Sequence, residues 1–206
     1  MLHEAILDRS THQLLEEYCK LPFLNNFSLA GGTALALRLG HRLSYDLDLF
    51  SIQKFQVDEL DKELESYFGL DYIKRGNLSD ALFTTIKNVK TDFVFDYGKR
   101  SEAIQAAGNI RLYPFEENIA MKLNAICGRD RKRDFYDLYF ILNAFTITEI
   151  TSFFTRKFSE EKLMVLYKSI TYFEDAENDE EPVLLKEKAP WDTIKKTIIK
   201  KMKTIR

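Results

Sequence analysis

Residues 27–51 read FSLAGGTALALRLGHRLSYDLDLFS, and the pattern of residues changes several times along this stretch. A short apolar run comes first, as in a buried strand. Gly31, Gly32 and Thr33 follow, and then come good helix formers that stop at Gly40, with Thr33 expected to cap the helix. The last residues alternate polar and apolar, which is typical of a half-buried strand. The stretch therefore predicts a strand, a glycine turn, a helix and a second strand.

Two aspartates, Asp46 and Asp48, are expected on one face of the second strand, because side chains two residues apart point the same way. Like charges side by side on a sheet repel one another, and sheets disfavour Asp. A shared divalent cation would relieve this repulsion, and all-oxygen ligation suits Mg²⁺. Upstream, Gly31, Gly32 and Thr33 offer backbone N–H groups at a helix N-terminus, which favours a phosphate group. The aspartates and the glycine turn together predict a site for a metal ion and a nucleoside triphosphate (NTP).

The order strand, Gly-Gly-Thr, helix, His-Arg-x-Ser and Asp-x-Asp resembles the signature of the nucleotidyltransferase superfamily. The wider text GGTALAL…GHRLSYDLDLF is similar to its AbiEii/AbiGii-type toxin branch. The resemblance implies a third acid on a strand beside Asp46 and Asp48. Asp92 fits this role best, because it lies in the middle of a strand expected at 89–97, and Asp96 is the second candidate. The implied metal ligands are Asp46, Asp48 and Asp92, which would hold two Mg²⁺ ions.

A second block, AMKLNAI…KRDFYDLYFIL, resembles the downstream motifs of the same family. The resemblance implies that Lys122 touches the phosphates of the nucleotide, as a point charge can. It also implies that Asp137 orients Lys122 or the base, and that Arg129 or Arg133 holds phosphate or the acceptor. From the residues alone, the block is equally compatible with a helical hairpin that has a charged, solvated tip.

Composition restricts the class of protein. The chain has 206 residues, of which 45% are hydrophobic and 30% charged, and its net charge is −2. This is an ordinary balance for a globular protein, and nucleic acid could bind only at a local basic patch. Cys19 and Cys127 are too few and too far apart for a disulfide framework or a zinc site. With no signal peptide and no apolar run long enough to span a membrane, the sequence predicts a cytoplasmic protein without a membrane partner.

The periodicity predicts an α+β fold in two parts. A nucleotidyltransferase-like mixed sheet with flanking helices is expected at 1–113, and it would be the catalytic domain. A helical domain is expected to follow at 114–206, because the apolar pattern from there on is helical almost to the end.

Several segments around the first stretch have their own patterns. Residues 57–68 predict an amphipathic helix. Residues 71–74 and 81–87 predict two strands, joined by a turn near Gly76. Residues 98–110 are polar and bounded by glycine, and we expect a connector there.

Two charged segments lie near the C-terminus. Residues 174–181 hold six acids, and this segment predicts a mobile loop, because such a block repels itself. The last helix is expected to begin near Trp191 and ends in six positive charges, with no acid after Asp192. This basic tail could hold an RNA backbone, or it could only complement the helix dipole.

These features lead to the hypothesis of an Mg²⁺-dependent nucleotidyltransferase that moves a nucleoside monophosphate from an NTP to an acceptor. The resemblance implies an RNA acceptor, tRNA included, and a cognate antitoxin, as in a type IV-like toxin–antitoxin or abortive-infection system. Two alternatives remain open. The acceptor could be a small molecule or a protein, or the chain could be an inert module that only binds a partner, although the intact Asp46 and Asp48 argue against this. The GxxxxGK[ST] and GxSxG motifs of P-loop proteins and serine hydrolases are absent.

Overall fold

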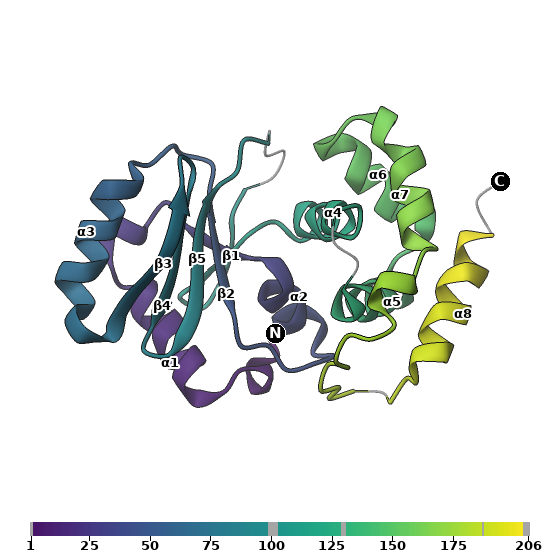
Figure 1. Ribbon diagram of the computed structural model, residues 1–206, viewed down its shortest axis with the longest axis horizontal. Coiled ribbons are helices and arrows are strands. Elements are labelled where there is room, and N and C mark those ends of the chain that lie inside the picture. Colours follow the sequence, from purple (N-terminus) through teal and green to yellow (C-terminus); the bar gives the residue numbers. More distant parts are fainter. Residues whose placement is uncertain (1, 99–102, 129–130, 187, 204–206) are drawn as a thin grey trace.

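A mixed β-sheet forms the centre of the first half of the chain (Figure 1). The computed structural model describes residues 2–98, 103–128, 131–186 and 188–203. Within them the sheet has seven strands in the order β3-β4-β5-β2-β1-β7-β6. The strands are β1 (Ser28–Ala30), β2 (Leu47–Ser51), β3 (Tyr72–Leu78), β4 (Ala81–Ile86), β5 (Val89–Phe95), β6 (Gln105–Ala107) and β7 (Ile110–Leu112). β2 runs antiparallel to β1 and parallel to β5, so the expected α+β fold with a mixed sheet is confirmed.

Helices flank the sheet and make up most of the second half of the chain (Figure 1). The α-helices are α1 (Arg9–Tyr18), α2 (Gly31–Leu39), α3 (Val57–Phe68), α4 (Phe115–Ile126), α5 (Lys132–Ala144), α6 (Ile147–Lys157), α7 (Leu163–Ile170) and α8 (Trp191–Met202). Short 3₁₀ turns lie at Glu4–Ile6, Pro22–Leu24, Gly69–Asp71, Glu160–Lys162 and Glu174–Ala176. α3 has the bounds that its amphipathic pattern predicts, with Val57, Leu60, Leu64 and Phe68 buried on one side.

Helix α2 belongs to two apolar cores at once. Ala34, Ala36 and Leu37 pack in one core with residues of α1, α3 and the sheet. Leu35, on the other side of α2, packs in a second core with residues of α4 to α8. Because both cores hold α2, the glycine turn at its N-terminus has a fixed position between the sheet and the helices.

Two expectations about the strands are wrong. β3 continues through Gly76 to Leu78, and the turn to β4 lies at 79–80. The pairing of β3 with β4 shifts between Lys74 and Gly76, which is a β-bulge at Arg75. A glycine inside a strand often marks such a bulge, and Gly76 lies at the bulge and not in a turn. The segment 98–110, expected as a connector, contains β6 and the start of β7, and β7 extends the sheet beside β1.

The start of α2 also differs from the expectation. The helix begins at Gly31 with Ala30 as its N-cap residue, so Thr33 lies inside the helix and does not cap it. The Thr33 hydroxyl donates to the Asp46 backbone carbonyl and shares a hydrogen bond of 2.7 Å with Ser44 Oγ. Thr33 therefore fixes the loop that leads into β2. Gly40 ends the helix in the left-handed conformation, with a φ of 64°, as its sequence position predicts.

Among the described residues, no single helix combines the length and the apolar composition needed to cross a membrane. The pair α5 and α6 meets that criterion only when the two are joined, and they meet at a bend of 115°. Many side chains of both helices are buried in the second apolar core.

Candidate active site

Asp48 and Asp92 face each other across two paired strands. β2 and β5 run parallel with Asp48 directly opposite Asp92, and Asp46 lies just before β2. Burial raises the pKa of Asp48, and the carboxylates of Asp92 and Asp46 raise it further. Burial also raises the pKa of Asp92. The structure therefore brings the three predicted metal ligands within electrostatic reach of one another, in a repulsive arrangement that a bound cation would relieve.

The three carboxylates have different partners. Asp46 Oδ2 lies 3.7 Å from Arg133 Nη1, and Asp92 accepts a hydrogen bond from Arg75. In the described part of the chain, the Asp48 side chain has neither a hydrogen bond nor an ion pair. A carboxylate that is largely enclosed and has no protein partner fits a metal ligand, because an enclosed charge is costly unless it is paired or coordinates a metal.

Gly31 makes room for the Asp48 carboxylate. Its φ is +65°, and a Cβ atom at this position would lie 2.1 Å from Asp48 Oδ2. The Gly31 N–H donates to Asn118 Oδ1 at 2.9 Å, and its carbonyl accepts from Asn118 Nδ2 at 3.1 Å. This N–H, which we expected to face a phosphate, is thus already bonded to α4. Gly32 is equally constrained, since its Cβ would lie 2.5 Å from Arg42 Nη2.

Substituting Gly31 with Ala should destabilise the protein by about 3 kcal/mol. The left-handed backbone accounts for about 1–2 kcal/mol, and the contact with Asp48 adds about 1–3 kcal/mol of overpacking. Gly108→Ala is the matched control, because Gly108 has a φ of +59° and nothing within 4 Å of the added Cβ. Urea denaturation of both variants measures the difference. Equal losses for the two variants would contradict the packing of Asp48 against Gly31.

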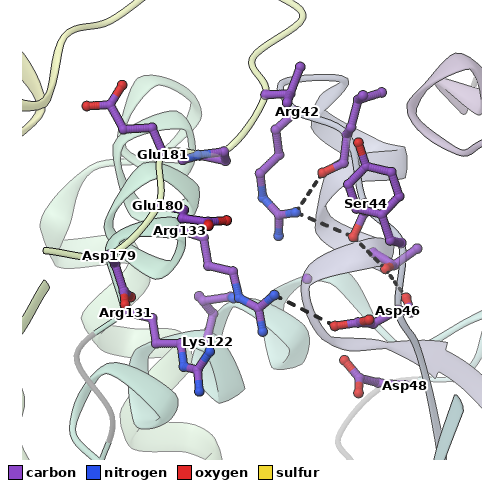
Figure 2. Close-up of a pocket in the computed structure, with 16 residues that line it drawn as sticks. Arg42, Ser44, Asp46, Asp48, Lys122, Arg131, Arg133, Asp179, Glu180 and Glu181 are labelled. Carbon is purple, nitrogen blue, oxygen red and sulfur yellow. Dashed lines mark hydrogen bonds and ion pairs between the residues drawn. The ribbon is translucent and has the colours of Figure 1, made fainter. Parts of the chain in front are cut away.

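A pocket of about 460 Å³ opens beside Asp46 and Asp48 (Figure 2), a size typical of small-molecule sites. One wall is the turn and loop with Gly32, Thr33 and residues 42–46. The opposite wall carries three cations, Lys122, Arg131 and Arg133. Arg133 extends across the pocket toward Asp46 (Figure 2). The pocket therefore sets positive groups against the aspartates, as a site for a metal-bound phosphate requires.

Asp137 lies buried behind this pocket and is surrounded by basic groups. Its Oδ1 lies 2.6 Å from Arg42 Nε and 2.7 Å from His41 Nε2, and its Oδ2 lies 2.7 Å from Lys122 Nζ. Burial alone would raise the pKa of Asp137, but Arg42 and Lys122 hold it well below its usual range. Lys122 Nζ also lies 2.7 Å from Asp134 Oδ1. Asp137 therefore fixes both Arg42 and Lys122 at the pocket wall.

Residues 177–185, which we call the acidic strap, form the remaining wall. Two backbone hydrogen bonds tie the strap to the loop before β2, from Leu43 N to Val183 O and from Leu185 N to His41 O, each of 2.9 Å. At its other end, Lys132 Nζ donates to the Glu177 carbonyl at 2.9 Å. The strap brings Asp179, Glu180 and Glu181 to the pocket (Figure 2). The sequence predicts a mobile loop at 174–181, whereas the structure bonds Glu177 and Asp179 of this segment to Lys132. The residues that follow it, Val183 and Leu185, are bonded to the loop before β2.

Sequence reasoning also missed Arg131, which lines the pocket from the N-cap position of α5. Arg129, the other arginine expected there, lies outside the described residues. Asp96, the second candidate for the third acid, lies beyond the end of β5 and is bonded to Lys157 Nζ at 2.8 Å. The register of β2 and β5 places Asp92, and not Asp96, opposite Asp48.

In the part of the chain that the structure describes, no group of three or more His, Cys, Asp or Glu side chains is arranged so that it could hold a metal by itself. The aspartates are separately engaged, with Asp46 on Arg133 and Asp92 on Arg75. This donor set fits Mg²⁺, which binds one or two carboxylates and takes its other ligands from substrate phosphates and water. It does not fit an ion that needs a complete protein cage.

Comparison of the sequence with known proteins finds a matching family model and a relative. A family model described as "Nucleotidyl transferase AbiEii toxin, Type IV TA system" matches residues 13–204. An uncharacterized protein of Aquifex aeolicus (strain VF5) is 29% identical over 180 residues, which cover 84% of this chain and 86% of that protein.

Solved structures share the fold at low sequence identity. A putative nucleotidyltransferase from H. pylori has a TM-score of 0.51 at 18% identity and covers 99% of this chain and 96% of its own. JHP933 from Helicobacter pylori has a TM-score of 0.53 at 19% identity, and the match covers 98% of this chain and 92% of JHP933. MenT4, a nucleotidyltransferase toxin from Mycobacterium tuberculosis H37Rv, has a TM-score of 0.51 at 16% identity. The match covers 97% of this chain and 87% of MenT4.

Proposed function

Because the chain belongs to the AbiEii family of nucleotidyltransferase toxins, we propose that it transfers a nucleoside monophosphate from an NTP to an RNA acceptor in an Mg²⁺-dependent reaction. The observation that carries this proposal is Asp48. Its carboxylate has no partner in the described chain, lies opposite Asp92, and borders a pocket lined by four cationic side chains. An inert module that only binds a partner would have no need for this repulsive arrangement.

We assign the metal to Asp48 and Asp92, with Asp46 as a further ligand. Bound Mg²⁺ would neutralise phosphate charge and polarise the attacking and leaving oxygens. Asp46 would exchange its contact with Arg133 for the metal, and Asp92 would exchange its contact with Arg75. The first exchange releases the guanidinium of Arg133 for a phosphate oxygen of the nucleotide.

The triphosphate would lie in the pocket between the N-terminus of α2 and the cations of the opposite wall. Gly32 lets the backbone approach the phosphates, and the helix dipole of α2 favours their negative charge. Lys122, held in place by Asp137, and the arginines Arg131 and Arg133 would contact the β- and γ-phosphates. An acceptor hydroxyl would then lose its proton to solvent and form a bond to the α-phosphorus. The bond from the α-phosphorus to the oxygen that bridges to the β-phosphorus would break, and pyrophosphate would leave.

The nature of the acceptor and of the partner rests on the family. The family description names a type IV toxin–antitoxin system, and MenT4 is named a toxin. On this support we propose a tRNA acceptor, a cognate antitoxin that opposes the activity, and action in the cytoplasm, where NTPs and tRNA are found.

Incubation of the protein with each α-³²P-labelled NTP, Mg²⁺ and total tRNA tests the proposal. We expect label on tRNA with one or more NTPs, and none when EDTA replaces Mg²⁺. Label on the protein itself would indicate a protein acceptor instead of RNA. If no NTP binds in the presence of Mg²⁺, as measured by calorimetry, the enzymatic proposal is wrong.

A further inference from the structure

Two cations, Arg75 and Lys90, flank Asp92 outside the lining of the pocket. Arg75 donates through Nη2 to Asp92 and through Nε to the Thr84 carbonyl at 2.9 Å. Lys90 Nζ lies 3.8 Å from Asp92 Oδ2. The Arg75 and Lys90 side chains are 34% and 44% exposed, whereas the Asp92 side chain is 16% exposed. A large ligand can therefore reach the two cations while the carboxylate between them stays largely covered.

The β-bulge in β3 directs Arg75 to the Asp92 side of the sheet. Arg75 lies at the register shift between Lys74 and Gly76, and Phe83, the partner of Gly76, pairs in turn with Asp92. Its neighbour Lys74 turns the other way and pairs with Asp61 of α3 at 2.5 Å. Bulges often re-aim side chains next to functional sites. The consecutive residues Lys74 and Arg75 therefore contact different carboxylates, Asp61 and Asp92.

These cations do not belong to the nucleotide pocket. Neither Arg75 nor Lys90 nor Asp92 is among the described residues that line it, whereas Asp46 and Asp48 are. In an in-line displacement, the attacking oxygen approaches the α-phosphorus from the side opposite the leaving pyrophosphate. If the pyrophosphate lies in the pocket, the attacking group comes from outside it, and Asp92 with its two cations lies outside the pocket lining next to Asp48.

We propose that Arg75 and Lys90 form a binding position for a backbone phosphate of the RNA acceptor, next to the nucleoside that is attacked. The inference rests on the proposed function and adds the place where the acceptor binds. When Asp92 turns to the metal, its two cations become available, and a guanidinium beside an ammonium suits a phosphodiester. A polyanion matches this pair of positive charges better than a neutral small molecule or an average protein surface does.

The test compares two double variants with the same loss of charge. Arg75→Ala/Lys90→Ala removes the proposed position. Lys74→Ala/Lys87→Ala is the control, because those lysines pair with Asp61 and Glu17 away from Asp92. Total tRNA binding is followed by fluorescence anisotropy over a range of salt concentrations, and Mg²⁺–NTP binding by calorimetry.

We expect Arg75→Ala/Lys90→Ala to weaken tRNA binding about 10-fold or more and to lower the salt slope by about 1, since the contact with one phosphate is lost. The NTP dissociation constant should stay within about twofold of wild type, and the control should keep the wild-type slope. Thermal melts check that both variants are folded.

A salt slope for Arg75→Ala/Lys90→Ala equal to that of the control would overturn the inference, and so would the absence of tRNA binding by wild type at low salt. The binding test is independent of turnover. If wild type binds tRNA with the expected dependence on Arg75 and Lys90 but transfers no label, the proposed reaction fails while the phosphate position stands. If label transfer to tRNA proceeds and the slopes are equal, the reaction stands and the position fails.

Discussion

Asp48→Asn should abolish nucleotide transfer and, in the absence of metal, make the protein more stable than wild type. The loss of a metal-binding carboxylate should lower kcat/KM by about 10³-fold or more, equivalent to about 4 kcal/mol of transition-state stabilisation. The gain in stability follows from the surroundings of Asp48. Burial and the carboxylates of Asp92 and Asp46 raise its pKa above the ordinary value of 3.8. The neutral amide of Asn escapes both effects.

The pH dependence of this gain has a defined sign. A carboxyl whose folded pKa is raised contributes stability that is fully present below its unfolded pKa and is lost as the pH rises through the folded pKa. Wild type therefore carries a penalty at pH 7 that Asp48→Asn lacks, and the gap in melting temperature between the two should narrow toward pH 4. Thermal melts in EDTA at both pH values measure it, and added Mg²⁺ should stabilise wild type only.

The matched control for Asp48→Asn is Asp96→Asn, just after the end of the neighbouring strand β5. Asp96 is bonded to Lys157, whose side chain is only 2% exposed. Removing the negative charge of Asp96 should destabilise the protein and leave NTP binding intact. Asp48→Asn should do the reverse, stabilising the metal-free protein and abolishing transfer. An Asp48→Asn variant that keeps a tenth or more of wild-type transfer would refute the assignment of Asp48 to the metal.

Asp137→Ala should have the largest effect on stability, with an expected loss of about 3–5 kcal/mol in the free energy of unfolding. Asp137 is fully buried and its two oxygens contact His41, Arg42 and Lys122. The substitution leaves the buried charge of Arg42 without the carboxylate that it contacts, and it leaves Lys122 with Asp134 only. Because both residues line the pocket, we also expect Mg²⁺–NTP binding to be lost.

Urea denaturation compares Asp137→Ala with Glu116→Ala, which breaks an ion pair at the surface. The side chains of Glu116 and Arg156 are 35% and 49% exposed, so this control should lose about 1 kcal/mol or less. Similar losses for the two variants would mean that Asp137 does not hold the buried charges together.

The parts of the site that the sequence predicts are those with a local pattern. The alternation around Asp46 and Asp48 and the glycines before α2 follow from a stretch of about two dozen residues. The parts that it missed depend on contacts between distant residues. Asp137 meets His41 across 96 positions of the chain, and Leu43 meets Val183 across a still longer interval. Periodicity and composition carry no information about such pairs.

The acidic strap shows this difference most clearly. The composition of residues 174–181, with six acids, predicts a mobile loop. In the structure, Lys132 holds one end of the strap and the loop before β2 holds the other. Gly76 is a smaller example, because a glycine next to polar residues fits either a turn or a bulge, and only the pairing of β3 with β4 decides between them.

The strap also bears on how the cell makes this protein. The pocket takes residues from Gly32 at one end of the chain to Val183 near the other, and Glu177 is held in turn by Trp191 and Lys195 of α8. During translation, the aspartates and the glycine turn are made long before the last wall of the pocket. A nascent chain, or one truncated by a frameshift before the strap, carries the aspartates without the complete pocket. Toxicity would therefore begin only once synthesis has passed the acidic strap.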